Sequence, residues 1–348
     1  MKKLTKEVIC GNIKIGGNNP ITIQSMTNTD TKDVYSTVKQ IKELEEIGCD
    51  IIRVAVPDME AAQKLGEIKR SINIPLIADI HYDYRLALEA INQGIDGLRI
   101  NPGNIGSLDR VREIVKKAKN RKIKIRVGVN GGSLEKDLIQ KYGRPTPQAL
   151  VESALRHVNL LESMDFDNIV ISLKSSDIYT TIKAYEIMSQ KVNYPLHIGI
   201  TEAGSVKKGT VKSSIGIGYL LINGIGDTIR VSLTGDPKEE ILIAREILKC
   251  LGIKKQGIQI ISCPTCGRCN IDLIDIVSKV EERVENIDKN MTVAIMGCSV
   301  NGPGEAREAD IGIAGGKNEG LFFRKGAIVR KIKAENMVKE LIDEIIKF

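Results

Sequence analysis

The sequence predicts an α/β protein in which a TIM (β/α)8 barrel precedes a small α+β domain. Three observations support this fold class. Eight short β-rich runs alternate with helical patterns over roughly the first 240 residues, which is the size of a TIM barrel. The first run is followed by QSMTNTD (24–30), which lacks the glycine-rich phosphate turn that is typical of a doubly wound open sheet. From about residue 258 the alternation stops and another arrangement of strands and helices begins.

The eight expected barrel strands are short and rich in Ile, Val and Leu, as buried parallel strands are. In chain order they are residues 21–26, 50–56, 75–80, 97–102, 124–130, 168–174, 195–201 and 228–233. The stretches between them carry apolar residues at helical spacing. The clearest of these helical stretches are residues 34–48, 85–94, 108–120, 147–164 and 238–252.

The second domain is expected to contain strands and helices in about 90 residues. Strands are expected at 258–264, 291–297, 309–315 and 322–332, with helices over 272–286 and at the end of the chain. The short joint at 252–257 is the expected boundary, so the predicted domains are a substrate-binding barrel over 1–254 and a cluster-bearing domain over 255–348.

Composition narrows the class of function. The chain has 348 residues with 42% hydrophobic and 27% charged residues, as a globular protein has. No apolar run reaches the roughly 18 residues of a membrane span, and the basic start has no signal-peptide core, so we expect a cytoplasmic protein with no membrane partner. A net charge of +7 suits an anionic small substrate, whereas 3% aromatic residues disfavour nucleic acid.

Cationic side chains recur at the carboxyl ends of the expected barrel strands. These positions are Arg53, Arg99, Arg126, Lys174 and Arg230, and the polar residues Asn101, Asn130, Ser172 and Ser232 accompany them. Catalytic groups in a TIM barrel come from these strand ends. Any one of these cations could face water at a splayed strand end, but five of them around one mouth would repel each other unless an anion were bound. We therefore expect a substrate that carries phosphate or diphosphate.

A few residues among these cations could transfer protons. Asp79 and His81 lie in ADIHYD, and Glu202 lies in ITEAG just after the seventh strand. His81 and Glu202 are therefore candidates for proton transfer, and orienting an arginine is the alternative role for either. His197 lies within the seventh strand, whereas His157 lies in a helical stretch and is expected to be structural.

Seven cysteines in a chain without a secretion signal indicate metal binding, catalysis or burial, not a disulfide framework. Cys263, Cys266 and Cys269 follow one another at three-residue steps, and Cys298 is followed by Glu305 beyond a Gly-Pro-Gly turn. Three cysteines and a glutamate would suit an iron-sulfur cluster with one oxygen ligand. Zinc held by the four cysteines is the alternative, although the second domain has no histidine.

These motifs resemble a known family over nearly the whole chain. CPTCGR, MGCSVNGPGE, ITEAG, ADIHYD and LRINPGNIG are similar to those of the 4-hydroxy-3-methylbut-2-en-1-yl diphosphate synthases of the non-mevalonate isoprenoid pathway, in their shorter bacterial two-domain form. The resemblance implies a TIM barrel followed by a domain like parts of sulfite reductase. It also implies a 4Fe-4S cluster held by Cys263, Cys266, Cys298 and Glu305. Cys269 is not a ligand in that pattern.

The resemblance further implies an iron-sulfur oxidoreductase. Its reaction would be the reductive ring opening and dehydration of 2-C-methyl-D-erythritol 2,4-cyclodiphosphate to 4-hydroxy-3-methylbut-2-enyl diphosphate. Two electrons would come from a flavodoxin or ferredoxin. The arginines and Lys174 would bind the two phosphates, and Glu202 would be the leading candidate for proton transfer.

A geometric argument favours a homodimer with a shared active site. The last barrel helix should end near Leu251 at the face opposite the substrate, and a joint of about six residues spans at most about 20 Å. The cluster domain is then poorly placed to cover its own barrel, so we expect it to cover that of a second subunit, as the resemblance also implies.

Three other functions remain as alternatives at this point. One is a pterin-binding or aldolase-like transferase with a structural zinc domain and no redox role. Another is a nucleic-acid-binding zinc module, for which Phe322 and Phe323 beside Arg324 and Lys325 would have to be exposed, although paired aromatics of this kind more often lie in a core. A radical-generating cluster enzyme is disfavoured because its cysteine motif normally comes early in the barrel.

Overall fold

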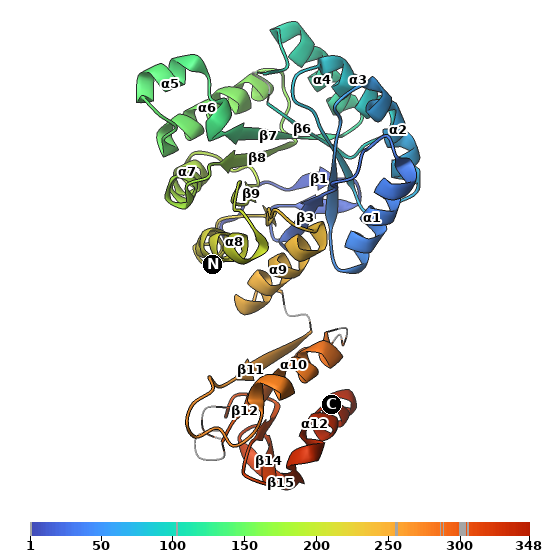
Figure 1. The fold of residues 1–348 in the computed structure, drawn as a ribbon. Helices are drawn as coiled ribbons and strands as arrows, with labels where there is room; N and C mark the ends of the chain where they lie inside the picture. The colour runs from blue at the N-terminus through green and yellow to red at the C-terminus, as the bar shows by residue number, and fades with distance from the viewer. Residues whose placement is uncertain are drawn as a thin grey trace. The chain divides into compact units, whose positions relative to one another are not determined.

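The computed structural model describes residues 2–101, 104–254, 257–285, 287, 289–298, 304 and 306–348. The chain forms two compact units, Met1–Leu251 and Gly252–Phe348 (Figure 1). Each unit has a hydrophobic core of its own. Within the described part of the chain, no helix has the length and apolar character needed to cross a membrane.

The first unit is the predicted TIM barrel, in which eight strands form one parallel sheet. The strands are β3 (Thr22–Met26), β4 (Ile51–Ala55), β5 (Leu76–Asp79), β6 (Gly97–Ile100), β7 (Lys124–Asn130), β8 (Ile169–Lys174), β9 (His197–Ile198) and β10 (Thr228–Ile229). Consecutive strands pair from β3 to β8 and again from β9 to β10, and β10 also pairs with β3. A parallel bridge between Ile171 and Leu196 joins β8 to the start of β9, which nearly closes the barrel.

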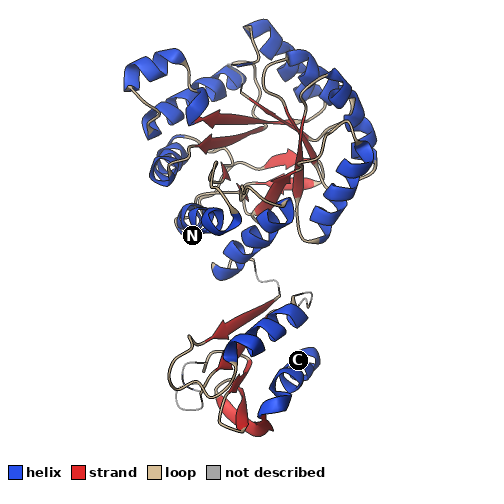
Figure 2. Ribbon diagram, in the orientation of Figure 1, coloured by secondary structure: helices blue, strands red, loops and turns tan. Residues whose placement is uncertain are grey.

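Helices surround these strands (Figure 2). They are α1 (Val34–Glu46), α2 (Met59–Arg70), α3 (Tyr84–Asn92), α4 (Leu108–Asn120), α5 (Lys136–Tyr142), α6 (Pro147–Glu162), α7 (Ile178–Lys191), α8 (Val206–Ile222) and α9 (Pro237–Cys250). Several begin at an aspartate whose carboxylate accepts a backbone N–H of the first turn, as Asp58 does from Ala61 and Asp177 from Thr180. Such caps supply partners for N–H groups that the helix leaves unpaired, and they fix where each helix starts near the barrel mouth.

A short antiparallel hairpin precedes the barrel and was not expected from the sequence. Its strands are β1 (Val8–Cys10) and β2 (Ile13–Ile15). Cys10 and Ile15 pack against Ile51, the first residue of β4. The hairpin therefore contacts the end of the barrel opposite the mouth. Burial raises the pKa of the Cys10 thiol to about 11, so this cysteine is an inert core residue.

The barrel interior is unusually polar for this fold. Bulky aliphatic residues normally fill a TIM barrel. Here the buried side chains include Gln24, Arg53, Asp79, Arg99 and Arg126, which come from five neighbouring strands. Ion pairs and hydrogen bonds between these strands offset part of the cost of burial.

The second unit is a five-stranded mixed sheet with helices. Its strands are β11 (Ile258–Ser262), β12 (Met291–Met296), β13 (Ile311–Ala314), β14 (Glu319–Arg324) and β15 (Ala327–Lys333), and its helices include α10 (Leu273–Val284) and α12 (Met337–Lys347). The first three strands are parallel and the last two are added antiparallel. Phe322 and Phe323 are buried in separate cores, which excludes the nucleic-acid surface that would need them exposed.

Candidate active site

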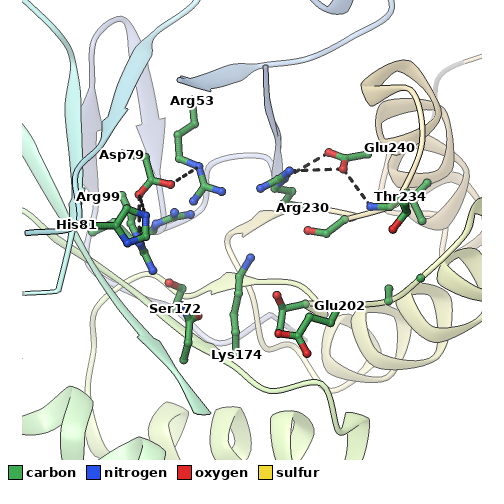
Figure 3. A pocket seen from close by; sticks show the side chains of 17 residues that line it. Arg53, Asp79, His81, Arg99, Ser172, Lys174, Glu202, Arg230, Thr234 and Glu240 are labelled. Atoms are coloured by element: carbon green, nitrogen blue, oxygen red, sulfur yellow. Dashed lines mark hydrogen bonds and ion pairs between the residues drawn. The ribbon is translucent and has the colours of Figure 1, made fainter. Parts of the chain in front are cut away.

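A cavity of about 330 Å³ opens at the carboxyl ends of the barrel strands (Figure 3). Its lining residues are Arg53, Asp79, His81, Arg99, Arg126, Asn130, Ser172, Lys174, Thr201, Glu202, Ala203, Gly204, Arg230, Ser232, Leu233, Thr234 and Glu240. Five of these side chains are arginine or lysine, and each comes from a different strand or the residue after it. The cavity therefore gathers cations that are up to 177 positions apart in the sequence, from Arg53 to Arg230.

The cavity brings together all but one of the barrel residues that were predicted from the sequence. The exception is Asn101, which is buried directly after β6 but is not part of the lining. Ser172 lines the cavity as expected. The main residue that sequence reasoning missed is Glu240, which lies in the first turns of α9. An acidic residue there is common simply because it complements the helix dipole, so nothing in the pattern of residues marked it as part of the site.

Asp79 at the end of β5 is the anionic centre of one side of the cavity. Its Oδ1 lies 3.1 Å from Nη1 of Arg99, and its Oδ2 lies 3.6 Å from Nε of Arg53. His81 Nε2 lies 3.6 Å from the same carboxylate and 3.2 Å from Arg99 Nη1. Burial raises the pKa of Asp79, but Arg53, His81 and Arg99 outweigh burial and hold this pKa well below its usual range. Asp79 is therefore a carboxylate that orients cations.

Two other cations in the cavity lack a carboxylate partner of this kind among the described contacts. Arg126 Nη1 donates to Gln24 Oε1 at 3.0 Å, while its buried Nε has no hydrogen-bond partner. Burial and the charges of neighbouring arginines lower the pKa of both Arg126 and Lys174 well below their ordinary values. In Figure 3, Lys174 reaches into the cavity from the side opposite Arg53 and Arg230. A bound polyanion would stabilise the charged forms of these groups.

On the other side of the cavity, Arg230 pairs with Glu240 (Figure 3). Arg230 Nε lies 3.3 Å from Glu240 Oε2, and Nη2 lies 3.4 Å from Oε1. The guanidinium and the carboxylate therefore meet side by side through two contacts, the arrangement in which arginine recognises carboxylates best. The third nitrogen of this guanidinium, Nη1, lies 3.7 Å from Met26 Sδ.

Glu202 differs from these residues because it is exposed. Its backbone has a φ of 53°, in the left-handed region that residues other than glycine rarely adopt. Such a conformation persists only where surrounding contacts hold it, and it often occurs at functional sites. Glu202 is thus the carboxylate of the lining that is accessible for proton exchange. His197, in contrast, is fully buried in β9, and burial together with Arg126 lowers its pKa well below the ordinary value.

Two cysteines of the second unit lie at the carboxyl ends of two paired parallel strands. Cys263 directly follows β11, and Cys298 follows β12 after Gly297. The Gly297 N–H donates to Cys263 Sγ at 3.2 Å, while the exposed Cys266 lies in the loop after β11. The predicted fourth ligand, Glu305, lies outside the described residues.

These residues fit an iron-sulfur cluster in the chemistry of their donors. Cys263 and Cys298 follow two paired strands and Cys266 lies in the loop after one of them. A backbone N–H is directed at the Cys263 sulfur, which is a contact that tunes such clusters. Among the residues that the structure describes, no three His, Cys, Asp or Glu side chains converge as a finished metal site. Cys269 instead packs beside Gly297 and donates from its Sγ to the Ile271 carbonyl at 3.2 Å.

Comparison with known proteins gives matches to both units. The model of the GcpE TIM-barrel domain matches residues 5–245, and that of the GcpE protein C-terminal domain matches residues 259–347. The 4-hydroxy-3-methylbut-2-en-1-yl diphosphate synthase (flavodoxin) of Clostridium perfringens is 64% identical over 98% of each chain. The enzyme of the same name from Caldanaerobacter subterraneus is 61% identical over 100% of this chain and 98% of that one.

Two solved structures share the barrel fold with this chain at low sequence identity. A 3-dehydroquinate dehydratase from Geobacillus kaustophilus aligns with a TM-score of 0.52 at 16% identity over 72% of this chain and 98% of that one. The dihydropteroate synthase of Yersinia pestis aligns with a TM-score of 0.51 at 8% identity over 71% and 98%. These likenesses show the barrel fold alone, so they lend no support to a pterin-dependent transferase. The domain matches and the high identity over the full length show that the chain belongs to the GcpE family.

Proposed function

We propose that this protein catalyses the reaction of its curated relatives, the formation of 4-hydroxy-3-methylbut-2-en-1-yl diphosphate. The substrate is 2-C-methyl-D-erythritol 2,4-cyclodiphosphate, which undergoes reductive ring opening and loses water. Two electrons and one proton are consumed, a ring carbon–oxygen bond to phosphate breaks, and a hydroxyl group leaves as water. The protein is thus an oxidoreductase of isoprenoid biosynthesis.

The observation that carries this proposal is the group of five cations around one cavity. Two linked phosphates present several oxygens that guanidinium groups can bind in pairs. Lys174 and Arg126 are buried and poorly compensated, so they gain most from a bound anion. Arg53, Arg99 and Arg230 are already oriented by Asp79 and Glu240, so they are ready to bind phosphate with little loss of side-chain freedom.

Glu202 is the proposed proton donor for the leaving oxygen. It is exposed at the cavity edge, whereas Asp79 and Glu240 are buried and committed to arginines. His81 contacts both Asp79 and Arg99, which also suits the orienting role that was considered for it. Because His81 also lines the cavity, proton transfer to the substrate is its other proposed role.

The proposed cofactor is a 4Fe-4S cluster, held by Cys263, Cys266, Cys298 and Glu305. When bound, such a cluster supplies single electrons from a donor protein to the substrate. The curated relatives carry flavodoxin in their names, and we propose a flavodoxin or ferredoxin as the donor here. A cytoplasmic location, where these donors occur, is part of the proposal.

The active site is proposed to be shared between the subunits of a homodimer, with the cluster domain of one subunit over the barrel mouth of the other. The barrel helices begin at the mouth, and exposed apolar side chains lie in their first turns or within two residues before them. These are Tyr35, Met59, Tyr82, Leu108 and Tyr179, with 38% to 80% of their surface exposed. Exposed apolar side chains around a polar opening are typical of a surface that another protein covers.

The decisive experiment is anaerobic turnover of the cyclodiphosphate with a strong chemical reductant. The purified full-length protein should consume the substrate and release the allylic diphosphate, and Lys174→Met should bind the substrate at least tenfold more weakly. Iron and sulfide analysis of the same sample, with absorption near 400 nm, tests the cluster separately. Protein that contains iron and sulfide but leaves the cyclodiphosphate unchanged would refute the proposed substrate.

A further inference from the structure

Glu240 is a buried carboxylate in the cavity wall, with 4% of its surface exposed. A buried carboxylate destabilises the fold unless charged or polar partners surround it. Glu240 has such partners for both oxygens. Oε2 accepts from Ser25 Oγ at 3.0 Å and from Arg230 Nε at 3.3 Å. Oε1 accepts from the Leu233 backbone N–H at 3.0 Å and from Arg230 Nη2 at 3.4 Å.

These contacts connect three parts of the barrel. Ser25 lies in β3, Arg230 directly follows β10, and Leu233 lies in the loop before α9, which carries Glu240 itself. The carboxylate therefore fixes both the guanidinium of Arg230 and the backbone three residues later. Because Arg230 lies among other cations, Arg53 included, it would be repelled from the cavity if this carboxylate were absent.

The backbone that Glu240 holds is also linked to the segment that carries Glu202. The Thr234 N–H, one residue after Leu233, donates to the Gly204 carbonyl at 2.9 Å. Thr234 also forms a parallel bridge with Ser205. Leu233 is packed so closely against α8 that a Cβ on Gly209 would collide with its side chain. Two adjacent loops of the cavity are thus joined, and the strained backbone of Glu202 lies in one of them.

We infer that Glu240 is a positioning residue for this reaction, acting on substrate affinity through Arg230 and on turnover through the joined loops that carry Leu233 and Glu202. This inference rests on the proposed function. Glu240 holds the Nε and Nη2 side of Arg230, which leaves the Nη1 side for a phosphate oxygen. Glu240 is not assigned a reacting role, because its two oxygens already accept four hydrogen bonds, which is about all that a carboxylate can accept.

The test compares Glu240→Gln with Glu239→Gln, its neighbour in the same turn of α9, for which no side-chain contact with the cavity is recorded in the described structure. Both substitutions remove one negative charge and keep the side-chain size. Turnover of the cyclodiphosphate gives KM and kcat, and calorimetry with inorganic pyrophosphate gives affinity without turnover. Glu240→Gln should raise KM and the pyrophosphate Kd about tenfold or more and lower kcat, whereas Glu239→Gln should match the wild type.

A double-mutant cycle shows whether Glu240 acts through Arg230. Since the two residues form one unit, Arg230→Ala with Glu240→Gln should bind pyrophosphate no more weakly than Arg230→Ala alone. Multiplicative losses, or a Glu240→Gln protein that behaves like Glu239→Gln, would overturn the inference. If Glu240→Gln does not fold, Glu240→Asp, which keeps the charge, replaces it in the double-mutant cycle. The same pyrophosphate affinities are then compared, and the same results support or overturn the inference. A wild type that binds pyrophosphate but leaves the cyclodiphosphate unchanged would refute the proposed function, while the cycle would still test the Glu240–Arg230 coupling.

Discussion

Nη1 of Arg99 lies 3.1 Å from Oδ1 of Asp79, and both side chains are buried within the barrel. Asp79→Asn would leave Arg99, and also Arg53, buried without their ion-pair partner. Breaking a buried ion pair by removing one partner costs about 3–5 kcal/mol. We therefore expect Asp79→Asn to lower the free energy of unfolding by about this amount at pH 7, measured by urea denaturation. Asp109→Asn, which affects an exposed ion pair on α4, is the control and should change stability little.

The ion pair between Asp79 and Arg99 also predicts how the stability difference between the wild type and Asp79→Asn depends on pH. The pKa of Asp79 is lowered in the folded protein, so the stability it contributes is present above its unfolded pKa of about 3.9 and is lost as the pH falls toward the folded pKa. The gap in stability between wild type and Asp79→Asn should therefore narrow below about pH 4. A gap that is constant from pH 7 to pH 3 would show that the charge of Asp79 does not stabilise the fold.

Lys174 should take up a proton when an anion binds. Burial and the neighbouring cations lower its pKa in the free protein, and a bound polyanion favours the charged amine and raises that pKa. At pH values between the pKa of Lys174 in the free protein and its pKa in the complex, anion binding is coupled to the uptake of up to one proton. The affinity for the anion then falls by up to about tenfold for each unit of rising pH. Calorimetry of pyrophosphate binding in buffers with different ionisation heats measures this uptake.

Lys174→Met provides the comparison, because pyrophosphate itself also exchanges protons. The wild type should take up more protons than Lys174→Met at the same pH, by as much as one per site. Lys183→Met, on the exposed face of α7, should match the wild type. Equal proton uptake in the wild type and Lys174→Met would mean that Lys174 is already charged in the free protein.

The barrel could be predicted from the sequence because buried parallel strands have a clear pattern of apolar residues. The strands from β3 to β8 lie within their predicted ranges, since most of them are rich in Ile, Val and Leu. The regular parts of β9 and β10 are only two residues long, although longer strands were expected. Gly199 follows β9 and approaches the Arg230 carbonyl so closely that a Cβ would collide with it. Close backbone contacts of this kind depend on tertiary structure and leave no periodic signal.

The site was predictable where residues lie on the barrel strands and less so elsewhere. Arg53, Arg99 and Lys174 could be found because a strand end in a TIM barrel has a known location. Glu240 lies on a helix, and its role depends on contacts with Arg230 and Ser25 that are 10 and 215 positions away. The β1–β2 hairpin was missed because two strands of three residues are too short to show an alternating pattern.

The cysteines should differ in their contribution to the cluster. Cys263→Ser, Cys266→Ser and Cys298→Ser should each lose most of the iron, the sulfide and the absorption near 400 nm after anaerobic purification. Cys269→Ser should retain them, because its thiol donates to the Ile271 carbonyl and a hydroxyl can do the same. Loss of the cluster in Cys269→Ser, together with four cysteines per bound zinc in the wild type, would instead favour the zinc site.

Mixing inactive variants tests whether two subunits share each active site. Glu202→Ala removes the proposed proton donor from the barrel, and Cys298→Ser removes a proposed cluster ligand from the other domain. In a head-to-tail dimer, a mixed pair contains one site made from the intact barrel of one subunit and the intact cluster domain of the other. Co-expressed, differently tagged subunits, purified through both tags, should therefore regain close to half of the wild-type activity per dimer, while each variant alone stays inactive.

The matched control for this experiment is a co-expressed pair in which one subunit carries both substitutions and its partner is wild type. In a shared-site dimer, the altered barrel and the altered cluster domain belong to different sites, so both sites of this control are inactivated. The control should therefore have no activity. If each site lay within one subunit, the two results would be exchanged: the control would keep half of the activity and the mixed pair would have none.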